Sequence, residues 1–199
     1  MATMLQVVEG AIDGDDRRAA NAALLDDFDS VVLRHQQRIY RVLLGLVSDS
    51  DTAQTLTQEC FLKAYRSRSN YRGEASVSTW LIRIAINLAH DYHRNRRMGF
   101  WRRLFAGDND ASEVVARRPS GAATPEQDLL AKEKLAAVWS AVEKLSPQQR
   151  AVFVLRFVEQ MSLEEIAAAT NLRPGTVKTH LFRALGTVRK RMKEWQVSP

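Results

Sequence analysis

The segment from Ser162 to Arg183 constrains this chain most, because its signals predict two helices joined by a tight turn. Ser162 is a natural N-cap, and Glu165 three positions later completes a capping box. Asn171 tolerates the left-handed conformation that ends a helix. Pro174 suits the first turn of the next helix, where its missing N–H would have no partner in any case. A helix-turn-helix of this kind places its second helix in the major groove of DNA.

The helix that follows Pro174 has two chemically different faces. One face is apolar at helical spacing and is expected to pack against the core. The core positions are Val177, Leu181, Ala184, Leu185 and Val188; the opposite positions are Thr179, Phe182, Arg183, Gly186 and Lys190, with Lys178 and Arg189 at the flank. An arginine that can fork onto guanine beside a ring that can contact a thymine methyl group is typical of base reading. The alternative is a solvated face with one stray phenylalanine.

The distribution of charge also indicates a polyanionic partner. The 199-residue chain has a net charge of +6. Residues 1–60 contain 5 Lys/Arg and 10 Asp/Glu, whereas the remaining residues contain 24 and 13. A basic remainder after an acidic start favours nucleic-acid binding by the later part of the chain.

Cysteine and histidine usage argues against disulfides, metals and other cofactors. The single cysteine, Cys60, rules out an intramolecular disulfide and a Cys-rich zinc site. Its apolar neighbours favour a buried structural thiol. His90 and His93 lie three positions apart without a carboxylate or thiol at ligand spacing, so we expect no metal and no cofactor. No stretch resembles a signal peptide or a membrane span, so we expect a cytoplasmic protein.

Apolar periodicity divides the chain into helical parts, and no strand of useful length is predicted. We predict an all-α fold of two small helical domains joined by a flexible linker, the second containing the helix-turn-helix. Residues 106–125 contain Gly, Pro, Ser and Asp without a period, which is typical of a linker. The predicted parts are an N-terminal tail at 1–25, a first domain at 26–98, a linker at 99–125 and a second domain at 126–199.

Two of the three helices expected in the first domain carry more than a core-facing stripe. The helix at about 52–66 has a surplus of large side chains, which indicates either a partner surface or burial on two sides. The helix at about 76–97 has a second stripe that combines an aromatic ring, an amide and arginines, the groups that hold single-stranded nucleic acid. The alternatives are a core tryptophan and weak surface ion pairs. The stripe consists of Trp80, Arg83, Asn87, Asp91 and Arg94, and residues 94–103 contain five arginines and no acid.

Three segments together resemble the extracytoplasmic-function (ECF) sigma factors of bacterial RNA polymerase. They read TQECFLKAYR, YRGEASVSTWLIRIAINLAHDYHR and LSPQQRAVFVLRFVEQMSLEEIAAATNLRPGTVKTHLFRAL, in this order around one linker. The resemblance covers about residues 28–192. It implies an alternative sigma factor that binds core RNA polymerase and directs promoter recognition, DNA melting and transcription initiation.

The resemblance also implies roles for particular residues. The stripe of Trp80, Arg83, Asn87, Asp91 and Arg94 would hold the melted minus-ten element, with Asn87 at the position that contacts a flipped-out base. The minus-thirty-five element would be read by Lys178, Thr179, Phe182 and Arg183. The polymerase contact would come from Leu56, Gln58, Glu59, Phe61 and Tyr65. An anti-sigma factor would be a further partner, and no membrane insertion is implied.

Two other classes of function, a different kind of regulator and an enzyme, fit the sequence less well. The sequence TVKTHL in the second helix also resembles the output domain of LuxR-type helix-turn-helix regulators. Such a regulator would not account for the Asn87 stripe or for the arginines of residues 94–103. An enzyme is not expected, because the chain shows no Ser/His/Asp set, phosphate loop or metal-ligand spacing.

Overall fold

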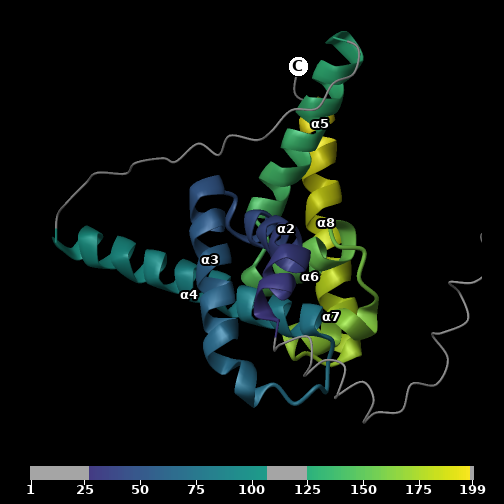
Figure 1. Cartoon of the computed structure of the whole chain (residues 1–199). Coiled ribbons are helices and arrows are strands. Elements are labelled where there is room, and N and C mark those ends of the chain that lie inside the picture. Colours follow the sequence, from purple (N-terminus) through teal and green to yellow (C-terminus); the bar gives the residue numbers. More distant parts are fainter. Residues whose placement is uncertain (1–26, 107–124, 198–199) are drawn as a thin grey trace, which may run out of the picture.

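The computed structural model describes residues 27–106 and 125–197, in which every regular element is a helix. The predicted tail at 1–25 and residues 107–124 of the predicted linker lie outside the described residues. The elements are α2 (Phe28–Val47), α3 (Ser50–Ser67), the 3-10 helix η1 (Arg68–Asn70), α4 (Val77–Ala106), α5 (Pro125–Glu143), α6 (Pro147–Phe157), α7 (Leu163–Thr170) and α8 (Pro174–Val197) (Figure 1). The all-α class is therefore confirmed for this part of the chain.

Local signals determine where α2 and α3 begin and end. The carboxylate of Asp27 accepts a hydrogen bond from the Ser30 N–H at 3.3 Å and caps α2. Helix α2 ends at Val47, and its C-cap Ser48 adopts the left-handed conformation at φ 59°. Asp49 then caps α3 by accepting from the Thr52 N–H at 2.8 Å. Ser48 and Asp49 thus form a capping segment that separates the two helices.

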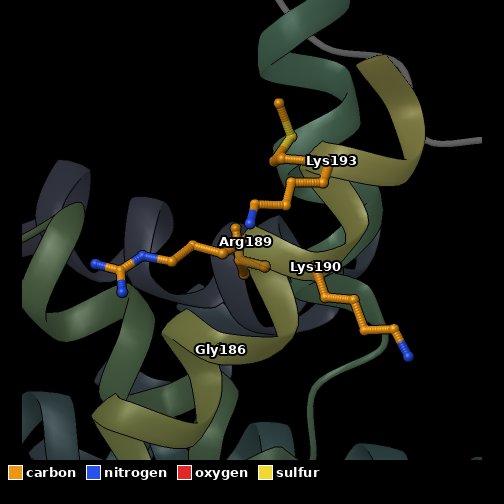
Figure 2. A pocket seen from close by; sticks show the side chains of 6 residues that line it. Gly186, Arg189, Lys190 and Lys193 are labelled. Carbon is orange, nitrogen blue, oxygen red and sulfur yellow. The ribbon is translucent and has the colours of Figure 1, made fainter. Parts of the chain in front are cut away.

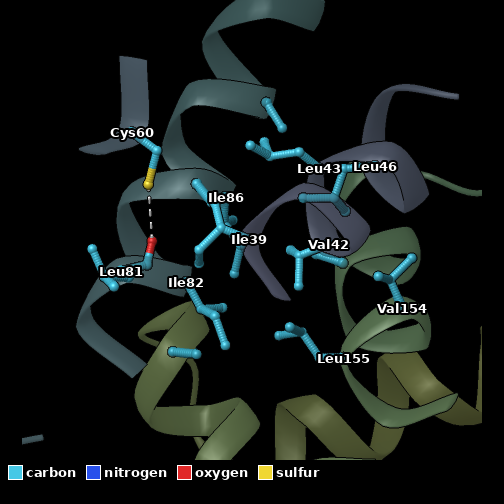
Figure 3. Packing of buried hydrophobic residues seen from close by; sticks show 14 of the residues in the cluster. Ile39, Val42, Leu43, Leu46, Cys60, Leu81, Ile82, Ile86, Val154 and Leu155 are labelled. Carbon is cyan, nitrogen blue, oxygen red and sulfur yellow. Dashed lines mark hydrogen bonds between the residues drawn. The ribbon is translucent and has the colours of Figure 1, made fainter. Parts of the chain in front are cut away.

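Helices α2, α3 and α4 pack together around an aliphatic core. Ile39 and Leu43 of α2 and Leu81 and Ile82 of α4 are completely buried there (Figure 3). The apolar side predicted for the third helix is buried as expected. This packing presents the opposite sides of α3 and α4 to solvent.

Helices α5 to α8 form the second region of the molecule. A capping box between Ser146 and Gln149 starts α6. Helices α5 and α6 both pack against α8. A small apolar cluster joins the three helices and consists of Ala141, Val142, Leu145, Phe153, Ala184 and Val188.

The two helical regions dock against each other and share one core. Val154 and Leu155 of α6 belong to the same buried cluster as Ile39 and Val42 of α2 (Figure 3). Helix α4 also lies against α7. At Gly45 of α2, an added Cβ would lie 2.9 Å from a methyl carbon of Val154, so the glycine allows α6 to approach. We call this docked state the closed arrangement.

Arg150 of α6 crosses the boundary between the regions and is only 7% exposed. Its Nε donates to the Gly45 carbonyl oxygen at 2.8 Å, and its guanidinium also bonds the Ser48 hydroxyl. A buried cation is costly unless its donors are paired. The end of α2 supplies carbonyl oxygens and the negative end of a helix dipole, which suit a guanidinium. Arg150 therefore fixes the end of α2 to α6.

Helix α4 is longer than predicted. The sequence pattern placed its end near residue 97, whereas the backbone helix continues through Gly99 to Ala106. A glycine inside a helix costs about 1 kcal/mol relative to alanine, which a helix of 30 residues tolerates. The arginine-rich residues 94–103 therefore belong to a helix, although side chains from residue 96 onward lie outside those described.

Candidate nucleic-acid interface

Helices α7 and α8 form the predicted helix-turn-helix. The Ser162 hydroxyl accepts from the Glu165 N–H at 3.1 Å, and the Glu165 carboxylate accepts from the Ser162 N–H at 2.7 Å. Asn171 ends α7 in the left-handed conformation, at φ 57° and ψ 34°. Pro174 is the first residue of α8. The four local predictions for this motif are thus confirmed.

The two faces of α8 differ as the sequence predicted. Val177 and Ala184 are completely buried, and Val188 is 8% exposed. On the opposite face the Phe182 side chain is 79% exposed, and Lys178, Thr179 and Arg183 are exposed with it. The Thr179 hydroxyl donates to the Gly175 carbonyl oxygen at 3.0 Å, which leaves the hydroxyl oxygen free to accept. This face therefore presents two cations, an acceptor and an apolar ring to the surroundings.

A pocket of about 550 Å³ lies farther along α8. Its lining consists of Gly186, Val188, Arg189, Lys190, Met192 and Lys193. Figure 2 shows the side chains of Arg189 and Lys190 extending in opposite directions from the helix. Three cations around an apolar floor suit a phosphate backbone that passes along α8. The pocket therefore extends the basic surface of the helix-turn-helix.

The aromatic end of the α4 stripe is partly built into the core. Trp80 is half-buried and packs against Tyr71, with ring centroids 5.0 Å apart. The Tyr71 hydroxyl in turn donates to the Ala75 carbonyl oxygen. Trp80 also packs against the core cluster, and the part of its ring that remains exposed is suited to stacking against a base. The alternative interpretation, a core tryptophan, therefore describes only the buried part of Trp80.

The polar and charged part of the stripe lies on the exposed side of α4. Asn87 is exposed. Arg94 and Asp91 form an ion pair at 2.9 Å, with side chains 70% and 49% exposed. Such an exposed pair contributes about 0–1 kcal/mol. Arg83 is exposed too, but its Nη2 donates to the Ala168 carbonyl oxygen of α7 at 2.6 Å. The five predicted positions thus lie on one side of α4. One of them, Arg83, bonds to the second region through the Ala168 carbonyl oxygen.

The five positions predicted to contact polymerase divide between core and surface. Leu56 and Phe61 are only 7% and 8% exposed and belong to the core cluster. Gln58 is exposed, and Tyr65 is 47% exposed. Glu59 forms an ion pair with the residue four positions later at 3.3 Å. Phe61 packs against Phe28 of α2, with ring centroids 6.5 Å apart, and Leu56 lies in the core stripe of α3, so both side chains are buried in this arrangement.

One exposed apolar residue of α3 is not among the predicted contact positions. Leu62 is 48% exposed, and it lies four positions after Gln58 and three before Tyr65. These spacings place the three side chains on one side of the helix. Leu62 is apolar but lies outside the buried stripe of Leu56 and Cys60, and this pattern could have identified it from the sequence. Gln58, Leu62 and Tyr65 therefore form one exposed surface of α3.

Cys60 has the structural role that the sequence predicted. Its side chain is completely buried, and its thiol donates to the Leu81 carbonyl oxygen at 3.5 Å (Figure 3). Burial raises the pKa of the Cys60 thiol to about 12. In residues 27–106 and 125–197 there is also no cluster of His, Cys, Asp or Glu that could hold a metal ion. None of the described helices has an apolar stretch that could span a membrane.

Family models match both halves of the chain. The model described as Sigma-70 region 2 matches residues 31–98, and the model described as Sigma-70, region 4 matches residues 135–192. The first match contains α3 and the exposed stripe of α4. The second contains the helix-turn-helix.

Two solved structures share the fold. One is the sigma factor RpoE in complex with the anti-sigma factor NepR from Bartonella quintana, with a TM-score of 0.65 and 24% identity over 84% of this chain and 97% of that one. The other is CnrH in complex with the cytosolic domain of CnrY, with a TM-score of 0.63 and 21% identity over 90% of this chain and 99% of that one.

Characterised relatives match over most of their length. The RNA polymerase sigma-H factor of Pseudomonas aeruginosa is 33% identical over 196 residues, which cover 94% of this chain and 93% of the relative. The ECF RNA polymerase sigma-E factor of Escherichia coli strain K12 is 34% identical over 161 residues, or 79% and 82% of the two chains. With both regions present in the order of the family, the chain belongs to the ECF sigma factors of the sigma-70 family.

Proposed function

We propose that this protein, an alternative sigma factor that directs RNA polymerase to promoters, uses three separate helical surfaces for its work. The exposed face of α8 reads the duplex minus-thirty-five element, the stripe on α4 holds the melted minus-ten element, and α3 binds core polymerase. The observation that carries this proposal is that one chain exposes both a base-reading helix and an amide-and-arginine stripe on different elements. A LuxR-type regulator needs only the first of these surfaces.

Duplex reading rests on Phe182 and Arg183. Arg183 donates to the acceptors of a guanine, and the exposed Phe182 ring contacts thymine methyl groups. Lys178 and Thr179 lie earlier on the same exposed surface, nearer the N-terminal end of the recognition helix, which enters the groove first. The cations farther along α8, including Lys190, contact phosphates without reading the sequence.

Melting needs a surface that compensates for the loss of base stacking. Extruding one base costs a few kcal/mol. The Asn87 amide offers a donor and an acceptor to a base edge, Trp80 offers a ring face, and Arg83 and Arg94 neutralise phosphates. In this proposal Asp91 orients Arg94 through the ion pair that the two form.

The polymerase surface is proposed to be Gln58, Leu62 and Tyr65, with Glu59 at its edge. Exposed leucine and tyrosine side chains on one helix face are typical anchors of protein interfaces. Leu56 and Phe61 contribute indirectly, because they pack α3 against the core and so fix the orientation of this face.

We further propose that an anti-sigma factor binds the protein, as in the two solved complexes of similar fold. The protein is proposed to act in the cytoplasm, where polymerase and promoter DNA are found. It is also proposed to carry out no chemistry of its own, because RNA synthesis is catalysed by the polymerase.

Reconstitution with purified core RNA polymerase tests the proposed function. We expect the protein to co-purify with core polymerase and to direct initiation at a defined set of start sites, mapped by sequencing of the transcripts. Two weak DNA readers become strong together when polymerase fixes their spacing. Sequence-specific binding by the free protein that polymerase does not change would instead support a LuxR-type regulator.

A further inference from the structure

One residue of the proposed polymerase surface is restrained by a helix other than its own. Tyr65 of α3 is 47% exposed. The ring of Phe28, the first residue of α2, contacts it in an edge-to-face arrangement, with centroids 5.3 Å apart and 71° between the ring planes. Phe28 contacts Phe61 in the same manner, at 6.5 Å and 77°. Because Phe61 is only 8% exposed, Phe28 connects the exposed Tyr65 ring to the core.

The positions of these aromatic residues in the sequence explain the contact. Phe61 and Tyr65 are four positions apart, so their side chains lie on the same side of α3, one turn from each other. The carboxylate of Asp27 caps α2 and fixes the first turn, in which Phe28 lies. Edge-to-face aromatic pairs are favourable beyond the apolar area that they bury. The orientation of the Tyr65 ring therefore depends on α2 as well as on α3.

Arg68 restrains the same ring from the end of α3. Its guanidinium carbon lies over the Tyr65 ring, 3.8 Å from the centroid. Its Nη1 donates to the Tyr65 carbonyl oxygen at 2.7 Å, which fixes the guanidinium in this place. The backbone tightens into the 3-10 helix η1 at Arg68, and side chains three positions apart are eclipsed in such a turn. The attraction between a planar guanidinium and an aromatic ring adds to this restraint.

We propose that Phe28 and Arg68 are positioning residues of the polymerase surface, which hold the Tyr65 ring in the orientation that contacts core polymerase. This inference rests on the proposed role of α3. A side chain that is already held in one orientation loses less conformational entropy when a partner immobilises it. Neither Phe28 nor Arg68 acts on polymerase directly, and both act through Tyr65.

The first test measures the mobility of the Tyr65 ring in the free protein. The four tyrosines are replaced with fluorotyrosine, and the fluorine resonance of Tyr65 is identified by its loss in Tyr65→Phe. We expect this resonance to narrow in Phe28→Ala and in Arg68→Lys, because a released ring reorients faster than the whole protein. Arg72→Lys makes the same change as Arg68→Lys at an exposed position beyond η1, and it should leave the line width unchanged. An unchanged line width in Phe28→Ala and Arg68→Lys would overturn the inference.

The second test determines whether both residues act through Tyr65. Phe28→Ala and Arg68→Lys should each weaken binding of the full-length protein to core polymerase by about two- to tenfold, whereas Arg72→Lys should match wild type. In a Tyr65→Ala background the first two substitutions should have no further effect, because the ring that they restrain is gone. A loss of the same size in both backgrounds would indicate a packing defect or a direct contact with polymerase, and either would overturn the inference.

Tyr65→Ala and Leu62→Ala separate failure of this inference from failure of the proposed function. If only the inference is wrong, these two variants bind core polymerase weakly, while Phe28→Ala and Arg68→Lys bind like wild type or lose affinity independently of Tyr65. If the role of α3 is wrong, Tyr65→Ala and Leu62→Ala bind like wild type, and the inference is overturned with it.

Discussion

Asn87 is the single residue on which the proposed strand contact depends most. Its amide is exposed on α4, and alanine in its place removes the contact to a base edge without loss of charge or helix propensity. We expect Asn87→Ala to bind polymerase and duplex promoter normally but to form the open complex poorly. Permanganate reactivity of promoter thymines measures this opening.

A matched control for Asn87 is available on the same helix. Asn95→Ala makes the same substitution at an exposed position outside the stripe, and it should open promoters normally. A template with a pre-melted bubble should rescue Asn87→Ala only in part, because the lost contact also holds the strand after melting. Normal opening by Asn87→Ala would remove this residue from the site.

Arg183 and Lys190 should behave differently although both are exposed cations of α8. Arg183→Ala should cost about 1–3 kcal/mol of binding and relax specificity at one base pair, because a guanine contact is lost. Lys190→Ala should weaken binding to every sequence alike and lower the salt slope. Holoenzyme affinities for a panel of minus-thirty-five variants would reveal this difference. Identical profiles for the two variants would mean that the base-reading face is assigned wrongly.

At the scale of the element, α3 separates a buried side from a binding side. Leu62→Ala should weaken polymerase binding by more than about 1 kcal/mol, or about fivefold, if this side chain anchors the interface. The substitution favours the helix, so a folding defect is not expected. Leu33→Ala on α2, where the leucine is 72% exposed, is the matched control. Equal affinities of both variants for core polymerase, measured by surface-immobilised binding, would place the contact elsewhere.

At the scale of the whole molecule, the docking of the two regions depends on Gly45. Gly45→Ala improves helix propensity by about 1 kcal/mol, yet its methyl group collides with Val154 across the boundary and costs about 1–3 kcal/mol. We therefore expect the closed arrangement to lose population. Spin labels on cysteines introduced at the exposed positions Ser69 and Lys144 would report longer distances. Cys60 would not be labelled, because burial raises its thiol pKa to about 12.

Gly186→Ala provides the control for this experiment. A Cβ at Gly186 meets no atom within 4 Å, so the substitution should stabilise α8 by up to about 1 kcal/mol and leave the distance distribution unchanged. If Gly45→Ala also left the distances unchanged, α6 would accommodate the methyl group without undocking.

The sequence by itself determined the local elements of the protein. The caps at Asp49, Ser146 and Ser162, the left-handed Asn171 and the start of α8 at Pro174 follow from side chains that bond backbone groups within a few residues. Such interactions need no distant partner, so they can be identified before the fold is known. Helical periodicity also separated Val177 and Ala184, which are buried, from the exposed Phe182.

Only the tertiary structure decided what covers each face. Periodicity shows which residues share a side of a helix, but it does not show which element packs there. For this reason Phe61, which periodicity placed beside the core stripe of α3, is buried against α2, whereas Leu62 is exposed. The bonds of Arg150 to α2 and of Glu159 to Arg38 join residues more than a hundred positions apart. No local pattern encodes such pairs, because they form only when two helical regions come together and exclude water between them.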